Sequence, residues 1–147
     1  MSKNIVYCSD GTWNGPATRT NVSILYDMLV NDGVTQCAIY DQGVGRTGGF
    51  LKRLSGGAFG DGLVDNIRKG YASIARVHER RDRLSLFGFS RGAYTARSLA
   101  GMIAYCGLPV DGDTDLVELA FDAPTGPECP VHRGRRAPAH SPMRTSR

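Results

Sequence analysis

The stretch "LSLFGFSRGAYTARSLAG", residues 84–101, joins a short apolar run to a segment with helical spacing, through a serine between two glycines. The almost entirely apolar residues 84–89 predict a buried strand of a parallel sheet, and the Ala- and Leu-rich run that follows predicts a helix. A serine at the apex of a tight strand–helix turn is the context of a nucleophile elbow. The sequence therefore predicts Ser90 as a nucleophile, with Gly88 and Gly92 required by the strained turn and by close helix packing.

Two other segments bear on the same chemistry. The backbone N–H of Arg91 follows the serine, where an α/β hydrolase places one donor of its oxyanion hole. The other donor comes from the loop after the strand two positions earlier, which here is "DGTWN", residues 10–14, so Gly11 or Thr12 is expected to supply it. The alternatives are that Ser90 merely caps a helix and that residues 10–14 form a plain Asp-Gly turn.

The rest of the chain predicts an α/β fold. Residues 4–8 and 36–40 read as further strands, and helices are expected from Asn21 as N-cap, from Asp61, and over residues 91–106. The order β-α-β-α-β-α implies a parallel sheet with helices on both faces, that is, a partial α/β-hydrolase fold with the elbow after the third strand. Three strands are few for such a sheet, so the chain looks like part of a fold.

A second glycine motif is a weaker indication of a binding site. Residues 43–48, "GVGRTG", match the pattern GxGxxG and follow a strand, as in a dinucleotide-binding site. Such a fingerprint must open a helix at once, whereas here a glycine-rich run continues. A mobile loop beside the active site is the better interpretation, and no cofactor is expected.

The composition changes after residue 122. The chain has 147 residues and a net charge of +4, and residues 123–147 hold five of its seven prolines and five arginines against one acidic residue, Glu128. This segment thus carries the whole net charge, and its composition predicts a disordered tail after a domain formed by residues 1–122. It lacks lysine clusters and interleaved aromatic residues, so no nucleic-acid partner is expected. Out-of-frame or other non-native sequence is a further alternative for the tail.

The four cysteines show neither CxxC nor paired spacing, and Cys8 and Cys37 are expected as buried thiols. There is no signal-peptide pattern and no apolar run of membrane-spanning length. Synthesis in a reducing cytoplasm is therefore expected.

Several motifs together resemble a known family. "DGTWN", "TNV" at a helix start, "YDQGVGRTGG" and above all "LFGFSRGAYTARSLAG" are similar to a bacterial α/β-hydrolase family, once classed as a domain of unknown function, that includes type VI secretion phospholipase effectors. The resemblance covers residue 4 to about residue 110. It implies lipase or phospholipase chemistry with a Ser-His-Asp triad, a lipid or ester substrate and possible export by a type VI secretion system. Only Ser90 carries over directly.

The triad partners of Ser90 are hard to find in this sequence. In α/β hydrolases the acid and the histidine follow the nucleophile, but His78 precedes it on an apolar helix stripe, and His132 and His140 fall in the predicted tail. An acidic loop after the elbow helix reads as solvated rather than as a metal site or a triad acid; its members are Asp111, Asp113 and Asp115.

The sequence thus predicts a serine hydrolase of the lipase or phospholipase type that is truncated and lacks the triad acid and histidine. The alternative is a non-catalytic remnant or small binding protein that keeps the scaffold. Metal ligation is not expected, and the oligomeric state is left open.

Overall fold

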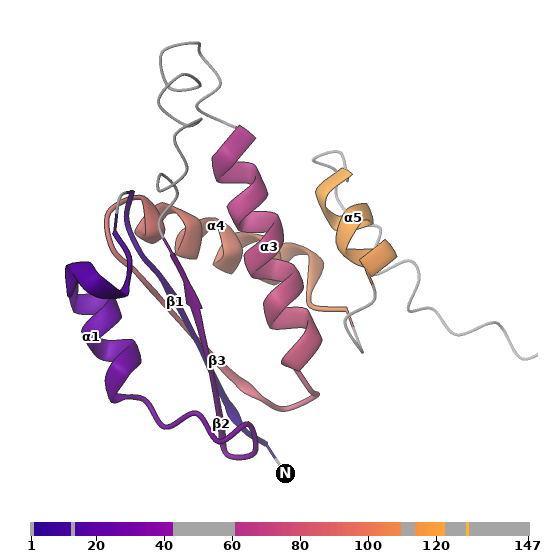
Figure 1. The fold of residues 1–147 in the computed structure, drawn as a ribbon. Coiled ribbons are helices and arrows are strands. Elements are labelled where there is room, and N and C mark those ends of the chain that lie inside the picture. Colours follow the sequence, from indigo (N-terminus) through magenta and orange to yellow (C-terminus); the bar gives the residue numbers. More distant parts are fainter. Residues whose placement is uncertain (1, 13, 43–60, 110–113, 123–128, 130–147) are drawn as a thin grey trace, which may run out of the picture.

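The computed structural model describes residues 2–12, 14–42, 61–109, 114–122 and 129. Their core is a parallel three-stranded sheet in the order β2-β1-β3 (Figure 1), formed by β1 (Asn4–Ser9), β2 (Gln36–Asp41) and β3 (Arg83–Gly88). Ser9 at the end of β1 lies beside Asp41 on one side and Gly88 on the other. The three carboxyl ends therefore meet at one edge of the sheet, and the predicted α/β class with parallel strands is confirmed.

Helices cover both faces of this sheet, as the crossovers predict. They are α1 (Asn21–Met28), α3 (Asp61–Val77), α4 (Arg91–Cys106) and α5 (Thr114–Asp122), with a short 3-10 helix, η1 (Pro16–Thr18), before α1. Figure 1 shows α1 on one side of the sheet and α3 and α4 on the other. The central strand β1 explains this arrangement. The chain moves from β1 to β2 in one direction and from β2 across β1 to β3 in the other direction. Because both crossovers are right-handed, their helices lie on opposite faces of the sheet.

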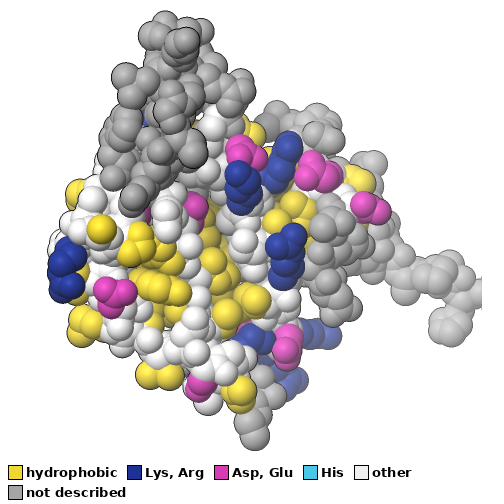
Figure 2. Space-filling view, in the orientation of Figure 1, with side chains coloured by type: hydrophobic (Ala, Val, Ile, Leu, Met, Phe, Trp, Pro, Cys, Tyr) yellow, Lys and Arg dark blue, Asp and Glu magenta, His cyan; other side chains and the backbone are white. Residues whose placement is uncertain are grey.

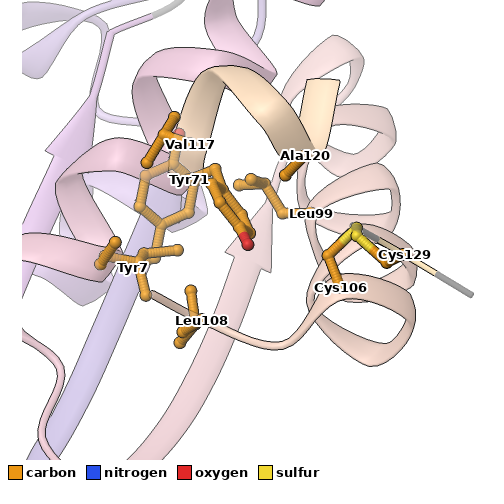
Figure 3. Close-up of a cluster of buried hydrophobic side chains, with 10 residues drawn as sticks. Tyr7, Tyr71, Leu99, Cys106, Leu108, Val117, Ala120 and Cys129 are labelled. Carbon is orange, nitrogen blue, oxygen red and sulfur yellow. A yellow bond between two sulfur atoms is a disulfide. The ribbon is translucent and has the colours of Figure 1, made fainter. Parts of the chain in front are cut away.

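Two hydrophobic clusters follow from this layering. Under α1, Val6 and Cys8 of β1 pack with Val22. On the other face, Tyr7 of β1 packs with residues of α3, α4 and α5 in a larger cluster (Figure 3), whose buried members are Tyr7, Tyr71, Ile74, Ala75, Leu99, Cys106, Leu108, Val117, Ala120 and Cys129. Alternate residues of one strand thus serve both faces.

Three expectations need correction. The strand before Ser90 is not buried: along β3, exposed and half-buried residues alternate, whereas residues 5–9 of β1 are all buried. The reason is position, since β3 pairs only with β1 in the part of the chain that the structure describes, while β1 is central. The N-cap of α1 is Thr20 rather than Asn21, because the Thr20 Oγ1 accepts the Ser23 N–H at 3.1 Å. The sequence did not predict α5, which begins within the expected acidic loop.

A disulfide joins Cys106, at the end of α4, to Cys129. Cys129 is 1% exposed and lies beneath α5 in the larger cluster (Figure 3). One residue of the segment predicted as a tail is therefore part of the hydrophobic core. Cys8 and Cys37 are free thiols, buried and half-buried respectively.

The surface carries mixed charges. On the face shown in Figure 2, hydrophobic side chains gather between α1 and α3, and basic and acidic side chains are interspersed around them. This distribution agrees with the absence of net charge in residues 1–122. Within the described residues, no helix is both long and apolar enough to span a bilayer.

Candidate functional site

Ser90 occupies a strained turn between β3 and α4. Its φ of 55° and ψ of −121° lie outside the regions that non-glycine residues ordinarily adopt. Such a conformation costs on the order of 1–3 kcal/mol and persists only where the surroundings enforce it. The side chain is exposed and makes no capping hydrogen bond to α4. The helix-capping alternative for Ser90 therefore lacks its defining contact.

Close backbone contacts leave no room for a side chain at the two glycines of the turn. A Cβ at Gly88 would overlap with the Gly92 carbonyl oxygen, and a Cβ at Gly92 would overlap with the Ser9 carbonyl oxygen. The Phe89 N–H also donates to the Ser9 carbonyl oxygen at 3.1 Å. The end of β1 thus packs directly against the turn, and any side chain at Gly88 or Gly92 would push the turn away.

Gly11 brings the loop after β1 against Ser90. A Cβ at Gly11 would lie 3.0 Å from the Ser90 Cβ and 3.2 Å from the Phe89 carbonyl oxygen. The Asn14 N–H donates to the Gly11 carbonyl oxygen at 3.0 Å and closes the turn. The structure therefore brings Gly11 against Ser90, with Thr12 and Arg91 next to them in the chain. The roles of these residues in an oxyanion hole stay a prediction.

Asp10 fixes the start of this loop. Asp10 is 3% exposed, and its Oδ1 accepts the Gly11 N–H at 2.9 Å. Its Oδ2 accepts the Thr20 hydroxyl at 2.8 Å and the Tyr40 hydroxyl at 2.6 Å. Burial, followed by the hydrogen bond to Asp10, raises the pKa of Tyr40, so its hydroxyl keeps its proton and stays a donor.

A second carboxylate lies at the same edge of the sheet but has a different set of contacts. The Asp41 Oδ2 accepts the Tyr7 hydroxyl at 3.0 Å and the Ser9 hydroxyl at 3.1 Å. Burial raises the pKa of Asp41, and these two hydrogen bonds oppose the rise. All three residues belong to β1 and β2, so this group ties the two strands together at their carboxyl ends.

The site lies at the point of the sheet where two neighbouring strands are followed by helices on opposite faces. The loop after β1 leads to α1 on one face, and the turn after β3 leads to α4 on the other. In open α/β sheets, ligands bind in the crevice at the carboxyl ends of the strands at such a switch point. Gly11 follows β1 and Ser90 follows β3, the two neighbouring strands at this switch point.

The one histidine among the described residues is far from Ser90. His78 directly follows α3, in the connection to β3. Glu79 and Asp82 of the same connection contact Lys3, just before the start of β1. Ser90 follows the opposite end of β3, and a strand of six residues spans about 20 Å. His78 is thus at the wrong edge of the sheet to serve as a base for Ser90.

Among the other candidate partners, Asp115 is the one with a described position. His132, His140, Asp111 and Asp113 lie outside the described residues, as does the 43–48 glycine motif. Asp115 is exposed in the first turn of α5. Among the residues with a described position, no group of three or more His, Cys, Asp or Glu side chains is arranged to hold a metal.

Exposed aromatic side chains flank Ser90. Phe89, directly before it, is 44% exposed, and Tyr94 in the first turn of α4 is 59% exposed. Phe87, two residues further back on β3, is 42% exposed. Exposed aromatic residues thus lie close to Ser90 along the chain, on both sides of the turn.

Comparison with known proteins gives two matches. The family described as "T6SS, Phospholipase effector Tle1-like, catalytic domain" matches residues 3–143. This match extends well beyond residue 122, where the composition changes. An uncharacterized protein of Saccharomyces cerevisiae is 36% identical over 135 residues, which cover 81% of this chain and 20% of the yeast protein. The chain thus spans about a fifth of the length of this relative, and the similarity is not confined to bacterial sequences. No solved structure matches the chain.

Proposed function

The chain belongs to the family of Tle1-like catalytic domains of type VI secretion phospholipase effectors, and we propose that it acts as a serine hydrolase on carboxylic esters of lipids, with Ser90 as the nucleophile. One observation carries the proposal. An exposed serine is held at positive φ between a strand and a helix, at the switch point of a parallel sheet, with a glycine loop packed against it.

In the proposed reaction the Ser90 Oγ attacks the ester carbonyl carbon, and a base takes the hydroxyl proton. The tetrahedral intermediate places a negative charge on the former carbonyl oxygen, which main-chain N–H groups stabilise in such sites. The N–H of Arg91, at the first position of α4, is the expected donor on one side, where the positive end of the helix dipole adds to it. The base then gives its proton to the alcohol as it leaves. It next takes a proton from water, which attacks the acyl-serine, and the proton returns to the Ser90 Oγ as the fatty acid is released.

The second donor belongs to the loop after β1. Of the two residues predicted for this role, Gly11 lies against Ser90 but directs its N–H to Asp10 at 2.9 Å. Thr12 is the next residue of the same turn. The contact between this loop and Ser90 supports an oxyanion hole shared by the two segments.

The base must come from outside the described residues. A base has to lie within hydrogen-bond reach of the serine, and His78 is at the opposite edge of the sheet. His132 and His140 are the remaining histidines of the chain. If neither serves, the chain is a scaffold without turnover, and the position of His78 is the observation that favours this second candidate.

The apolar surroundings of Ser90 support a lipid substrate. Exposed Phe89 and Tyr94 offer contact area for an acyl chain beside the hydroxyl. The family supports export as well, and the disulfide between Cys106 and Cys129 agrees with a destination outside the reducing cytoplasm.

Labelling of the full chain with a fluorophosphonate probe tests the proposal, with the site of labelling read by mass spectrometry. We expect one label on Ser90, absent from Ser90→Ala and retained in Ser85→Ala, which removes an exposed serine of β3. Loss of labelling in His132→Ala or His140→Ala would identify the base. A folded chain that takes no label would refute the hydrolase proposal and favour the scaffold.

A further inference from the structure

The Asp10 carboxylate connects three parts of the chain. Its partners are the N–H of Gly11 in the loop after β1, the hydroxyl of Thr20 just before α1, and the hydroxyl of Tyr40 on β2. All three contacts are hydrogen bonds of 2.6–2.9 Å to a residue that is 3% exposed. A buried carboxylate with this many donors is stable only in one orientation.

That orientation determines which backbone N–H of the loop can donate a hydrogen bond to an oxyanion at Ser90. The Gly11 N–H points to Asp10, and one N–H cannot serve a second acceptor with good geometry. The Thr12 N–H makes no hydrogen bond within the part of the chain that the structure describes. The loop also approaches the serine turn closely, because a Cβ added at Gly11 would lie 3.0 Å from the Ser90 Cβ and 2.8 Å from the Asn14 Nδ2.

We propose that Asp10 is a positioning residue, which holds the start of the loop after β1 so that the N–H of Thr12, and not that of Gly11, faces the oxyanion formed at Ser90. This inference rests on the proposed function. Asp10 itself touches neither the substrate nor the reacting atoms. It acts through the backbone of the next two residues.

Three variants of the full chain test the proposal by ester hydrolysis, with kcat and KM measured separately. Asp10→Ala frees the turn, and we expect kcat to fall by about 100-fold with KM nearly unchanged, as when one oxyanion donor is lost. Asp10→Asn keeps an oxygen acceptor for the Gly11 N–H, so kcat should recover to within about 10-fold of the parent. Asp41→Asn is the matched control. It alters a carboxylate at the same sheet edge whose hydrogen-bond partners within the described residues are Tyr7 and Ser9, and kcat should change less than about 3-fold.

Two milder variants keep the test valid if Asp10→Ala fails to fold. Thr20→Val and Tyr40→Phe each remove one hydroxyl donor and leave the carboxylate in place. Each should lower kcat by roughly 3- to 10-fold without a matching rise in KM, since a single hydrogen bond of the network is lost. Equal losses of kcat in the Asp10 and Asp41 variants would overturn the proposal, because they would indicate general destabilisation.

A second measurement does not depend on catalysis. Amide hydrogen exchange by NMR should show the Gly11 N–H protected in the parent and exchanging at least about 10-fold faster in Asp10→Ala, with no such change in Asp41→Asn. If no ester is hydrolysed, the proposed function fails while this measurement still decides whether Asp10 holds the turn. Unchanged exchange at Gly11 in a folded Asp10→Ala chain would overturn the positioning role, since that variant alone removes the acceptor of the Gly11 N–H.

Discussion

Two glycines of α4 occupy opposite environments. Gly92, in its first turn, packs its Cα against the backbone of Ser9 and Asp10, and a Cβ there would overlap with the Ser9 carbonyl oxygen. Gly101, further along the same helix, is exposed and would have nothing within 4 Å of an added Cβ. The same residue type therefore serves close packing at one position and only weakens the helix at the other.

We expect Gly92→Ala to lower the free energy of unfolding by about 2 kcal/mol or more, because backbone on both sides cannot yield as a flexible side chain would. Gly101→Ala should raise it by roughly 0.5–1 kcal/mol, since alanine restricts the unfolded chain and favours the helix. Urea unfolding of the two variants measures both effects. A Gly92→Ala variant as stable as the parent would show that β1 and the Ser90 turn are not in contact.

At this scale the sequence predicts what neighbouring residues determine. The need for Gly88 and Gly92 follows from the local pattern around Ser90, because strand, turn and helix are contiguous. The partners of Asp10 do not follow, because Thr20 and Tyr40 are 10 and 30 residues away and reach it only through the pairing of β1 with β2. A long-range hydrogen bond leaves no spacing signal in a single sequence.

At the scale of elements, a buried ion pair fastens the α3–β3 connection to the start of β1. The Lys3 Nζ lies 2.9 Å from the Asp82 Oδ2 and 3.1 Å from the Glu79 Oε1, and the Asp82 side chain is fully buried. Asp82 also accepts the backbone N–H groups of Lys3 and Glu79, at 2.9 and 2.8 Å. Burial tends to raise the pKa of Asp82, but these donors outweigh it and hold the pKa at about 2.

This ion pair makes the free energy of unfolding depend on pH in the acid range. The folded pKa of Asp82 is below its ordinary value of 3.8, so the unfolded chain binds the proton first. The stabilisation is complete above about pH 4 and is lost as the pH falls toward 2. We expect Asp82→Asn to remove part of this slope in thermal unfolding measured from pH 2 to 6.

Some of the slope should remain in Asp82→Asn, because hydrogen bonds from Thr35 and from the backbone also lower the pKa of Asp32. The control is Asp65→Asn, which removes an exposed carboxylate paired with Lys69 along α3 and should have little effect at any pH. An Asp82→Asn profile parallel to that of the parent would contradict the role assigned to the pair.

The sequence predicts the type and order of the main elements and misjudges two of them for a common reason. The apolar residues of β3 predict a buried strand, yet burial depends on which strand becomes central, and that is β1. The α5 segment, "TDLVELAFD", has the apolar spacing of a helix, but the acidic residues before it and the proline-rich run after it hide the pattern. Val117 and Ala120 become core residues only when α5 packs against the rest of the larger cluster.

At the scale of the whole molecule, the composition boundary near residue 122 does not coincide with the edge of the core. Cys129 is buried with Val117 and Ala120 and is bonded to Cys106 (Figure 3), and the family match continues to residue 143. The proline- and arginine-rich composition still favours a tail. If residues 1–122 form the domain, as we propose, then this tail is attached to it through the disulfide between Cys129 and Cys106. Composition averages over a segment and cannot show that one of its residues enters the core.

The attachment gives a prediction for the full chain. The disulfide closes a loop with a sequence separation of 23 residues, and a loop of that length corresponds to about 3 kcal/mol of stabilisation through the entropy of the unfolded chain. We expect Cys129→Ala to lower the free energy of unfolding by about this amount in oxidising buffer, and a reductant to have the same effect on the parent. Cys37→Ala is the control, because it removes a free, half-buried thiol and leaves the link intact. A chain ended after residue 122 should be at least as unstable as Cys129→Ala, since it loses both the link and the buried side chain. Equal unfolding midpoints for the parent with and without reductant would show that the link contributes nothing and that the core closes without Cys129.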